Sequence, residues 1–379
     1  MSAARPASEA GIRHVPLSRP SLDDREVELA TQVLRSDRLS LGPLLERFEA
    51  AFAEVVGAPY AAAVGSGTAG LHLLVVANGI GPGDEVITSP YSFVASANCA
   101  IYEGATPVFA DIDRRTLNLD PNAVEAAVSD RTRAVLAVDI YGYPCELDEL
   151  RAICDRHGLV LIEDSCEALG ARYRGRPIGA HGPSAVFAFY PNKQITTGEG
   201  GIVTTHSEDE WRLLASLRNQ GRADSGGWLE HARLGFNYRL DEIRAAVGIA
   251  QLEKLDEILV ARTATARRYD ELLRDIDGLG LPIADDVDHE RSWFVYVVVL
   301  PAGTDRERVI VDLDARGVST ARYLPCIHLQ PYMRERFGFG EGLCPVAEDV
   351  ASRTLALPFH TRLDEDDQAY VAEALRSVL

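Results

Sequence analysis

The chain has 379 residues, which is more than one hydrophobic core usually serves, so we expect two structural units. Hydrophobic residues make up 46% and charged residues 25%, the ordinary balance of a folded, water-soluble protein. The 57 acidic residues outnumber the 38 basic ones and give a formal net charge of -19. This field would repel a phosphate backbone, which argues against nucleic acid as a partner.

Six cysteines are scattered along the chain without a CxxC pair or zinc-ligand spacing, so we expect free thiols and no metal site. No secretory signal pattern opens the sequence, and the longest apolar runs are only long enough for strands. These features predict a cytoplasmic protein with no membrane segment.

The first half of the chain alternates between strand and helix patterns. Residues 1–18 lack an apolar period and predict a mobile or draped terminus, and two helices follow, over 22–34 and from residue 44 onward. The alternation that comes next predicts a mostly parallel sheet with helices on both faces. Its expected strands are 60–64, 84–88, 106–111, 134–138 and 159–164, and its helices include 95–102, 121–128 and 147–157.

A different pattern begins near residue 240. One long helical stripe runs to about residue 258 and suits a helix that bridges two units. Beyond it we expect a helix, a strand over 293–300 and an arginine-rich helix over 305–316, which together predict a smaller α+β unit. The predicted domains are therefore 1–255 and 256–379.

Residues 65–70, Gly-Ser-Gly-Thr-Ala-Gly, join a predicted strand to a predicted helix. Small and hydroxyl residues there leave backbone N–H groups free at the positive end of the helix dipole, where a phosphate can bind. The alternative is that Ser66 or Thr68 only caps the helix. The spacing is not that of a P-loop.

Two charged residues follow buried strands. Asp164 ends the strand over 159–164, where ligands collect in open α/β sheets, although it could instead cap a following helix. Lys193 lies in a loop after the apolar run 185–190. A solvated loop lysine is the ordinary alternative, but an amine beside buried aromatic surface also suits Schiff-base chemistry.

A phosphate turn, an aromatic residue after Pro90, a strand-terminal acid and a loop lysine thus occur in series along one α/β unit. Pyridoxal 5'-phosphate needs one of each: an anion site, a flat face for its ring, a carboxylate for its ring nitrogen and an amine for its aldehyde. The series therefore predicts a pyridoxal phosphate site.

The sequence resembles the DegT/DnrJ/EryC1/StrS family of pyridoxal phosphate-dependent sugar aminotransferases over most of its length. That resemblance implies an aspartate-aminotransferase-type (fold type I) large domain and a smaller C-terminal domain. It rests on the motifs at 65–69, 92–98, 163–171, 193–201, 236–239 and 325–328.

The resemblance implies a role for each matching residue. Lys193 would form the covalent aldimine with the cofactor, and Asp164 would partner its ring nitrogen. Phe93 would lie against the ring, and Asn237 would reach the phosphate of the partner subunit, which implies a homodimer with a shared active site. Ser66, Gly67 and Thr68 would hold the phosphate, and Glu167 would lie near the phenolic oxygen.

Two positions depart from the usual family pattern. Ala188 stands five residues before the lysine, where relatives often have a phosphate-binding serine. Glu167 replaces a frequent glutamine or histidine. So near the phenolic oxygen, a carboxyl must be protonated or share a proton. The alternative is that Glu167 points to solvent.

The resemblance also implies substrates: glutamate or glutamine as amino donor, and a nucleoside-diphosphate 4-keto-6-deoxyhexose as acceptor. Alternatives are a 3-keto sugar nucleotide, a cyclitol ketone, or a non-catalytic regulator that only binds the cofactor. Expected sugar or diphosphate contacts are Tyr190, Arg239, Tyr323 and His328. Arg239 could instead pair with an acid, and His328 could be a core histidine.

Overall fold

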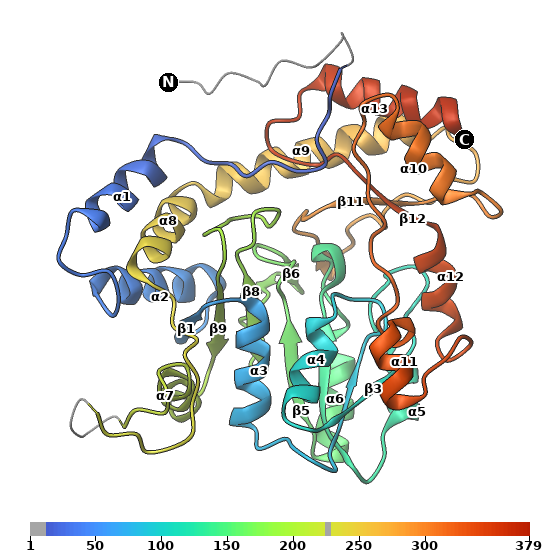
Figure 1. The fold of residues 1–379 in the computed structure, drawn as a ribbon. Coiled ribbons are helices and arrows are strands. Elements are labelled where there is room, and N and C mark those ends of the chain that lie inside the picture. Colours follow the sequence, from blue (N-terminus) through green and yellow to red (C-terminus); the bar gives the residue numbers. More distant parts are fainter. Residues whose placement is uncertain (1–12, 224–228) are drawn as a thin grey trace.

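The computed structural model describes residues 13–223 and 229–379. Its centre is a seven-stranded sheet in the order β1-β9-β8-β5-β4-β2-β3 (Figure 1). Within it β9 runs antiparallel to both neighbours and the other strands run in one direction, which confirms the predicted mostly parallel sheet. The strands are β1 (Tyr60–Val64), β2 (Glu85–Thr88), β3 (Thr106–Phe109), β4 (Thr132–Val138), β5 (Val160–Asp164), β8 (Ser184–Ala188) and β9 (Gly201–Thr205).

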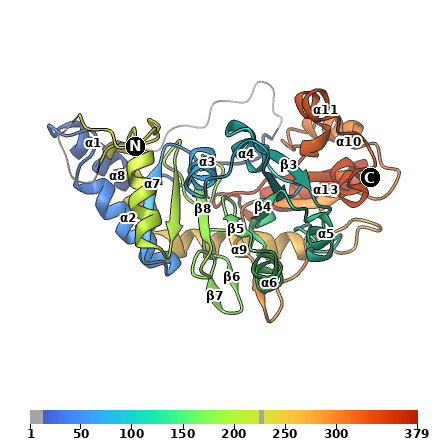
Figure 2. The same ribbon diagram turned by 90° about the horizontal axis from the view of Figure 1, so that it is seen from below.

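Helices cover both faces of this sheet, and Figure 2 shows α3 and α4 on one side of the strands and α6 on the other. Successive residues of β4 point to opposite faces: Val135 joins one hydrophobic core and Leu136 the other, as the two-residue period of a strand requires. The helices of this part are α1 (Asp24–Leu34), α2 (Pro43–Val56), α3 (Gly67–Ala77), α4 (Ala95–Tyr102), α5 (Pro121–Ala127), α6 (Leu147–His157), α7 (Glu208–Leu217) and α8 (Glu242–Glu253).

The C-terminal part pairs β11 with β12 in an antiparallel ribbon and surrounds it with helices. The apolar run 293–300 forms a shorter strand than predicted because β12 offers only four residues to pair with it. The elements are α9 (Leu255–Leu273), β11 (Tyr296–Val299), α10 (Arg306–Asp314), α11 (Pro331–Phe337), α12 (Pro345–Arg353), β12 (Thr354–Leu357) and α13 (Glu365–Val378).

The single bridging helix predicted from residue 240 is two helices. The chain leaves helical geometry at Lys254, where φ is -122° and ψ is 17°, between α8 and α9. The Lys254 ammonium pairs with Asp23 at 2.6 Å and with Glu26 at 2.7 Å. No proline or glycine marks this break in the sequence, so the apolar stripe alone did not reveal it.

Part of the predicted N-terminal segment docks on the C-terminal part. Val15 is fully buried, its peptide N–H donates to Gly317, and it belongs to the hydrophobic core formed mainly by residues 266–375. Residues 1–12 lie outside the described residues. The domain boundary at 255 stays a prediction.

A three-stranded ribbon connects the two parts: β10 (His289–Glu290) pairs with β6 (Arg172–Tyr173), which pairs with β7 (Arg176–Pro177). Among the described residues, no helix has both the length and the apolar composition that crossing a membrane requires.

Candidate active site

A cavity of about 470 Å³ opens at the edge of the sheet where the parallel strands end. The turns after β1, β2, β5 and β8 all contribute to its lining, as expected for ligand sites in open α/β sheets. Of the predicted site residues, the cavity brings together Ser66, Gly67, Thr68, Phe93, Asp164, Glu167, Tyr190, Lys193 and Tyr323.

The turn after β1 forms one end of the cavity at the N-terminus of α3. The Ser66 hydroxyl accepts a hydrogen bond from the Ala69 N–H at 3.1 Å, so Ser66 caps the helix and lines the cavity at once. A side chain at Gly67 would lie 2.8 Å from Cys166 Sγ and 2.9 Å from Ala188 Cβ, so only glycine fits. The free N–H groups and the dipole of α3 make this end suitable for an anion.

Lys193 is held firmly and is not a solvated loop lysine. Its side chain is 13% exposed, and its Nζ lies 3.4 Å from Glu167 Oε1 and 3.9 Å from the centre of the Phe294 ring. Its peptide N–H donates to Tyr190, and its carbonyl accepts from the buried Arg262 at 3.0 Å. Backbone and side chain are therefore both fixed at the cavity.

Lys193 is also the only lysine side chain available for this cavity. The sequence contains two lysines, and the second, Lys254, is paired with Asp23 and Glu26 at the junction of α8 and α9. If a lysine forms a covalent bond with a ligand in the cavity, it is Lys193.

Asp164 is buried at the end of β5 and does not cap a helix, because turns and no helix follow it. The Ser96 hydroxyl donates to Asp164 Oδ2 at 2.7 Å, and the Cys166 N–H donates to Oδ1 at 3.3 Å. Because the Ser96 hydroxyl donates its single proton to Asp164, the Ser92 hydroxyl must be the donor in the 2.7 Å hydrogen bond between the two serine hydroxyls. Sequence reasoning missed Ser96; its place in the 92–98 motif was the available signal.

Glu167 points into the cavity and not to solvent. Its Oε2 accepts the Tyr141 N–H at 2.8 Å, while Oε1 faces Lys193. Burial raises the pKa of the Glu167 carboxyl, and the Lys193 ammonium opposes that shift. Tyr141, in left-handed geometry with φ of 55°, is a second residue that sequence reasoning missed.

Three aromatic residues stand around the mouth of the cavity. Phe93 is 61% and Tyr190 53% exposed, so both present ring surface to the entrance. The Tyr323 hydroxyl accepts a hydrogen bond from Asn192 Nδ2 at 3.1 Å. This geometry suits a large substrate that enters from solvent.

The structure does not bring the other three predicted residues into the cavity. Asn237 lines a separate, shallow hollow that shares Ser66 and Thr68 with the main cavity. Arg239 donates to the side-chain oxygens of Asn219 at 2.9 Å and Gln220 at 3.0 Å, so within the described ranges its partners are amides and not an acid.

His328 is fully buried, with Nε2 3.0 Å from Glu348 Oε1. This position does not agree with the predicted substrate contact and corresponds to the alternative of a core histidine. The reason is that the chain folds back at residues 327–329 and packs His328 against Phe109.

The sequence profile of the DegT/DnrJ/EryC1/StrS aminotransferase family matches residues 20–376. The chain belongs to this family. Its members are pyridoxal phosphate-dependent sugar aminotransferases, so the predicted enzyme class is confirmed. The predicted fold type I architecture is confirmed as well.

Similar proteins cover nearly the whole chain. Spore coat polysaccharide biosynthesis protein SpsC of Bacillus subtilis is 40% identical, and the match covers 96% of this chain and 97% of the relative. GDP-perosamine synthase of Caulobacter vibrioides is 38% identical, with 97% and 99% covered. The crystal structure of DesV from S. venezuelae, in complex with a ketimine intermediate, is 38% identical and superimposes with a TM-score of 0.90, covering 96% of this chain and 98% of DesV.

The cavity fits the cofactor that the family implies. Ser66, Gly67 and Thr68 line the cavity at the N-terminus of α3, where free N–H groups and the helix dipole suit a phosphate. A buried carboxylate, Asp164, and a held amine, Lys193, line the same cavity. These are the groups that pyridoxal phosphate needs for its phosphate, its ring nitrogen and its aldehyde.

Proposed function

We propose that this enzyme moves an amino group from glutamate or glutamine to a nucleoside-diphosphate 4-keto-6-deoxyhexose, giving a 4-amino-4,6-dideoxy sugar nucleotide. The observation that carries the proposal is the single cavity in which Lys193, Asp164 and Glu167 meet the N-terminus of α3. Pyridoxal phosphate, when bound, supplies the electron sink that stabilises a carbanion at the donor's α-carbon.

Lys193 would hold the cofactor covalently before the reaction and act on protons during it. Its Nζ would take the proton from the donor's α-carbon as a base. It would then return a proton, as an acid, to the carbon on the other side of the transferred nitrogen. The contacts of its backbone with Tyr190 and Arg262 keep the amine at one place in the cavity. The amine therefore needs little reorganisation between the two transfers.

Asp164 would hold the proton on the ring nitrogen, and Ser96 orients its carboxylate for this task. Glu167 would share a proton with the phenolic oxygen, which agrees with the raised pKa that burial gives its carboxyl. The phosphate would lie at Ser66, Gly67 and Thr68, and Phe93 would cover the ring.

The active site is proposed to be completed by a second copy of the chain. Asn237 lines a hollow that borders Ser66 and Thr68 from outside the main cavity, so a residue from a partner subunit could approach the phosphate at that hollow. This supports a homodimer in which Asn237 reaches the cofactor of its partner.

The substrate assignment rests on the mouth of the cavity and on the relatives. Tyr190 and Tyr323 offer hydroxyls and ring faces for a sugar. Arg239 remains a proposed contact of the sugar or diphosphate. One relative is named for a GDP-linked sugar product. The free cysteines, five of them buried, agree with a cytoplasmic enzyme.

The test is to incubate the cofactor-loaded enzyme with glutamate and matched 4-keto and 3-keto sugar nucleotides. We expect release of 2-oxoglutarate with the 4-keto sugar, and a product whose new nitrogen lies on C4 by NMR. Turnover of only the 3-keto sugar would contradict the regiochemistry. No turnover with any keto sugar, glutamate or glutamine would contradict the proposed activity itself.

A further inference from the structure

A second cavity, of about 360 Å³, lies between the two parts of the chain. We call it the arginine cavity because Arg114, Arg115, Arg291 and Arg353 line it. Most of its other lining is apolar, and β11 and residues 280–283 supply much of that surface. It is separate from the active-site cavity, and none of the four arginines lines both.

Arg291 is a buried cation with no carboxylate in contact. It is 8% exposed, and no described acid lies within salt-bridge distance of its guanidinium. Its Nη1 donates to the Tyr141 carbonyl at 3.3 Å, and its Nε has no hydrogen-bond partner among the described residues. Burial lowers the pKa of Arg291 to about 10, so it stays charged at neutral pH.

The acids nearest to Arg291 are engaged elsewhere. Asp285 accepts the peptide N–H of Arg291 at 2.9 Å, and Asp270 accepts the Tyr296 hydroxyl at 2.6 Å. Both raise the pKa of Arg291 through space but do not touch its guanidinium. Its close neighbours are instead the rings of Tyr143 and Trp293, with centres 4.8 Å and 4.9 Å away.

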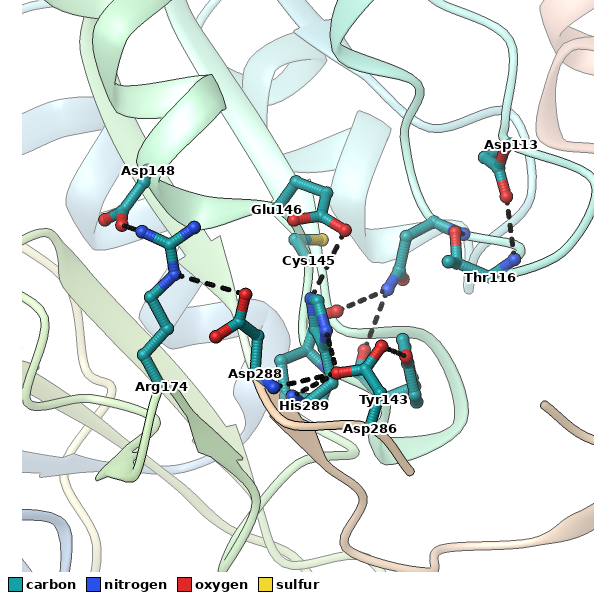
Figure 3. Close-up of polar contacts among 12 residues, drawn as sticks. Asp113, Thr116, Tyr143, Cys145, Glu146, Asp148, Arg174, Asp286, Asp288 and His289 are labelled. Carbon is teal, nitrogen blue, oxygen red and sulfur yellow. Dashed lines mark hydrogen bonds and ion pairs between the residues drawn. The ribbon is translucent and has the colours of Figure 1, made fainter. Parts of the chain in front are cut away.

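A polar network lies next to Arg291 in the sequence, and Figure 3 shows its members Tyr143, His289, Asp286 and Glu146. Tyr143 stacks on His289 with ring centres 5.1 Å apart, so its ring contacts both His289 and Arg291. His289 Nδ1 lies 2.9 Å from Asp286 Oδ1, and Nε2 lies 3.3 Å from Glu146. The segment that carries Arg291 is thus anchored to the large part of the chain, and the guanidinium is preorganised.

The charge at the rim is positive as well. Arg114 and Arg353 share one carboxylate, Asp349, at 2.5 Å and 2.6 Å. Arg115 is exposed and has no ion pair with any described residue. The three arginines at the rim therefore have a single carboxylate partner among the described residues. This local excess of positive charge contrasts with the formal net charge of -19 of the chain.

We propose that the arginine cavity binds a small organic acid, with its carboxylate at Arg291 and Arg115 and its apolar body against the valines of β11. A buried cation with no carboxylate in contact is costly, and a bound carboxylate would supply charge-assisted hydrogen bonds. The volume lies within the range of small-molecule sites, which are mostly apolar with few polar groups. This site does not depend on the proposed transamination.

The experiment is calorimetric titration of the cofactor-loaded full chain with benzoate, benzamide and inorganic phosphate. We expect saturable benzoate binding at one site per chain, and little binding of the neutral benzamide. Arg291→Gln should weaken benzoate binding by about tenfold or more, because it removes a hydrogen bond from a charged donor. Arg115→Gln, at an exposed position, should weaken it by about two- to fivefold.

Two further variants locate the binding. Arg308→Gln removes a similarly exposed arginine outside the cavity and should leave benzoate affinity unchanged. Tyr323→Phe alters the active-site cavity while keeping the cofactor and should also leave benzoate affinity unchanged, so the test holds whether or not the proposed function is right. If Arg291→Gln does not fold, the benzoate affinity of Arg115→Gln and the comparison of benzoate with benzamide still test the proposal.

Three results would overturn the proposal. These are the absence of saturable benzoate binding, equal binding of benzamide and benzoate, and equal benzoate affinity in Arg115→Gln and Arg308→Gln. Tight phosphate binding without benzoate binding would assign the cavity to an inorganic anion and would also overturn it.

Discussion

The Glu167 carboxyl lies 3.4 Å from the Lys193 ammonium, and both side chains are almost completely buried, at 10% and 13% exposure. The second Glu167 oxygen is fixed by the Tyr141 N–H. A carboxyl that burial makes harder to ionise is thereby held beside the one amine of the cavity. The pair can pass a proton over a short distance without solvent.

Replacing Lys193 should remove both activity and covalent cofactor binding. We expect Lys193→Ala to lower turnover by about a thousandfold or more and to lose the visible absorbance of the bound cofactor. The chain offers a matched control, Lys254→Ala, which should keep both. Borohydride reduction followed by peptide mass analysis should label Lys193 alone; a label on Lys254 would contradict the assignment.

Ser96 should matter through Asp164. Ser96→Ala removes a 2.7 Å hydrogen bond to a buried carboxylate, so we expect turnover and cofactor affinity to fall by about tenfold. Ser92→Ala keeps that contact and should have a smaller effect. Absorbance titrations with the cofactor would measure the difference. Equal effects of the two variants would show that Ser96 does not act by orienting Asp164.

Substitutions at Tyr323 and His328 should affect different properties of the enzyme, namely substrate turnover and thermal stability. Tyr323→Phe removes a cavity hydroxyl, and we expect kcat/KM for the keto sugar to fall by about tenfold while the cofactor absorbance is kept. His328→Asn disturbs a core contact with Glu348, so it should lower thermal stability and leave KM unchanged. A raised KM in the His328 variant would mean that the histidine reaches the substrate after all.

A serine at residue 188 would restore the hydroxyl that many relatives have there and that Ala188 lacks. Ala188 lines the cavity next to Gly67, so Ala188→Ser should add a phosphate contact and tighten cofactor binding by about three- to tenfold. Ala185→Ser, on the opposite face of β8, should only lower stability. The measurement is the cofactor dissociation constant by equilibrium dialysis. Unchanged affinity would mean that the phosphate lies elsewhere.

Asp139 should make stability fall as pH rises. Burial raises its pKa to about 6 from the ordinary 3.8, so the folded chain holds a proton that the unfolded chain releases. This group therefore stabilises the fold less at pH 7.5 than at pH 4.5, by about 2 kcal/mol. Asp139→Asn should lack that slope in urea unfolding monitored by fluorescence. Parallel pH profiles for the two proteins would contradict the assignment.

The sequence by itself determined most of the fold and the parts of the site. Short continuous apolar runs predicted β1 and β5, and the residues beside their ends, Ser66 and Asp164, were visible because turn and charged residues interrupt those runs. The break at Lys254 was not visible, since the apolar stripe continues through it and local propensity carries no signal.

Only the tertiary structure decided which parts meet. Ser96 and Asp164 are 68 residues apart and touch because α4 packs beside the end of β5. Packing also places Glu167 beside Lys193. It buries His328 in the core, although the family resemblance implied that this histidine contacts the substrate. Such contacts depend on the order of strands in the sheet and on how loops close over it, and a linear pattern records neither.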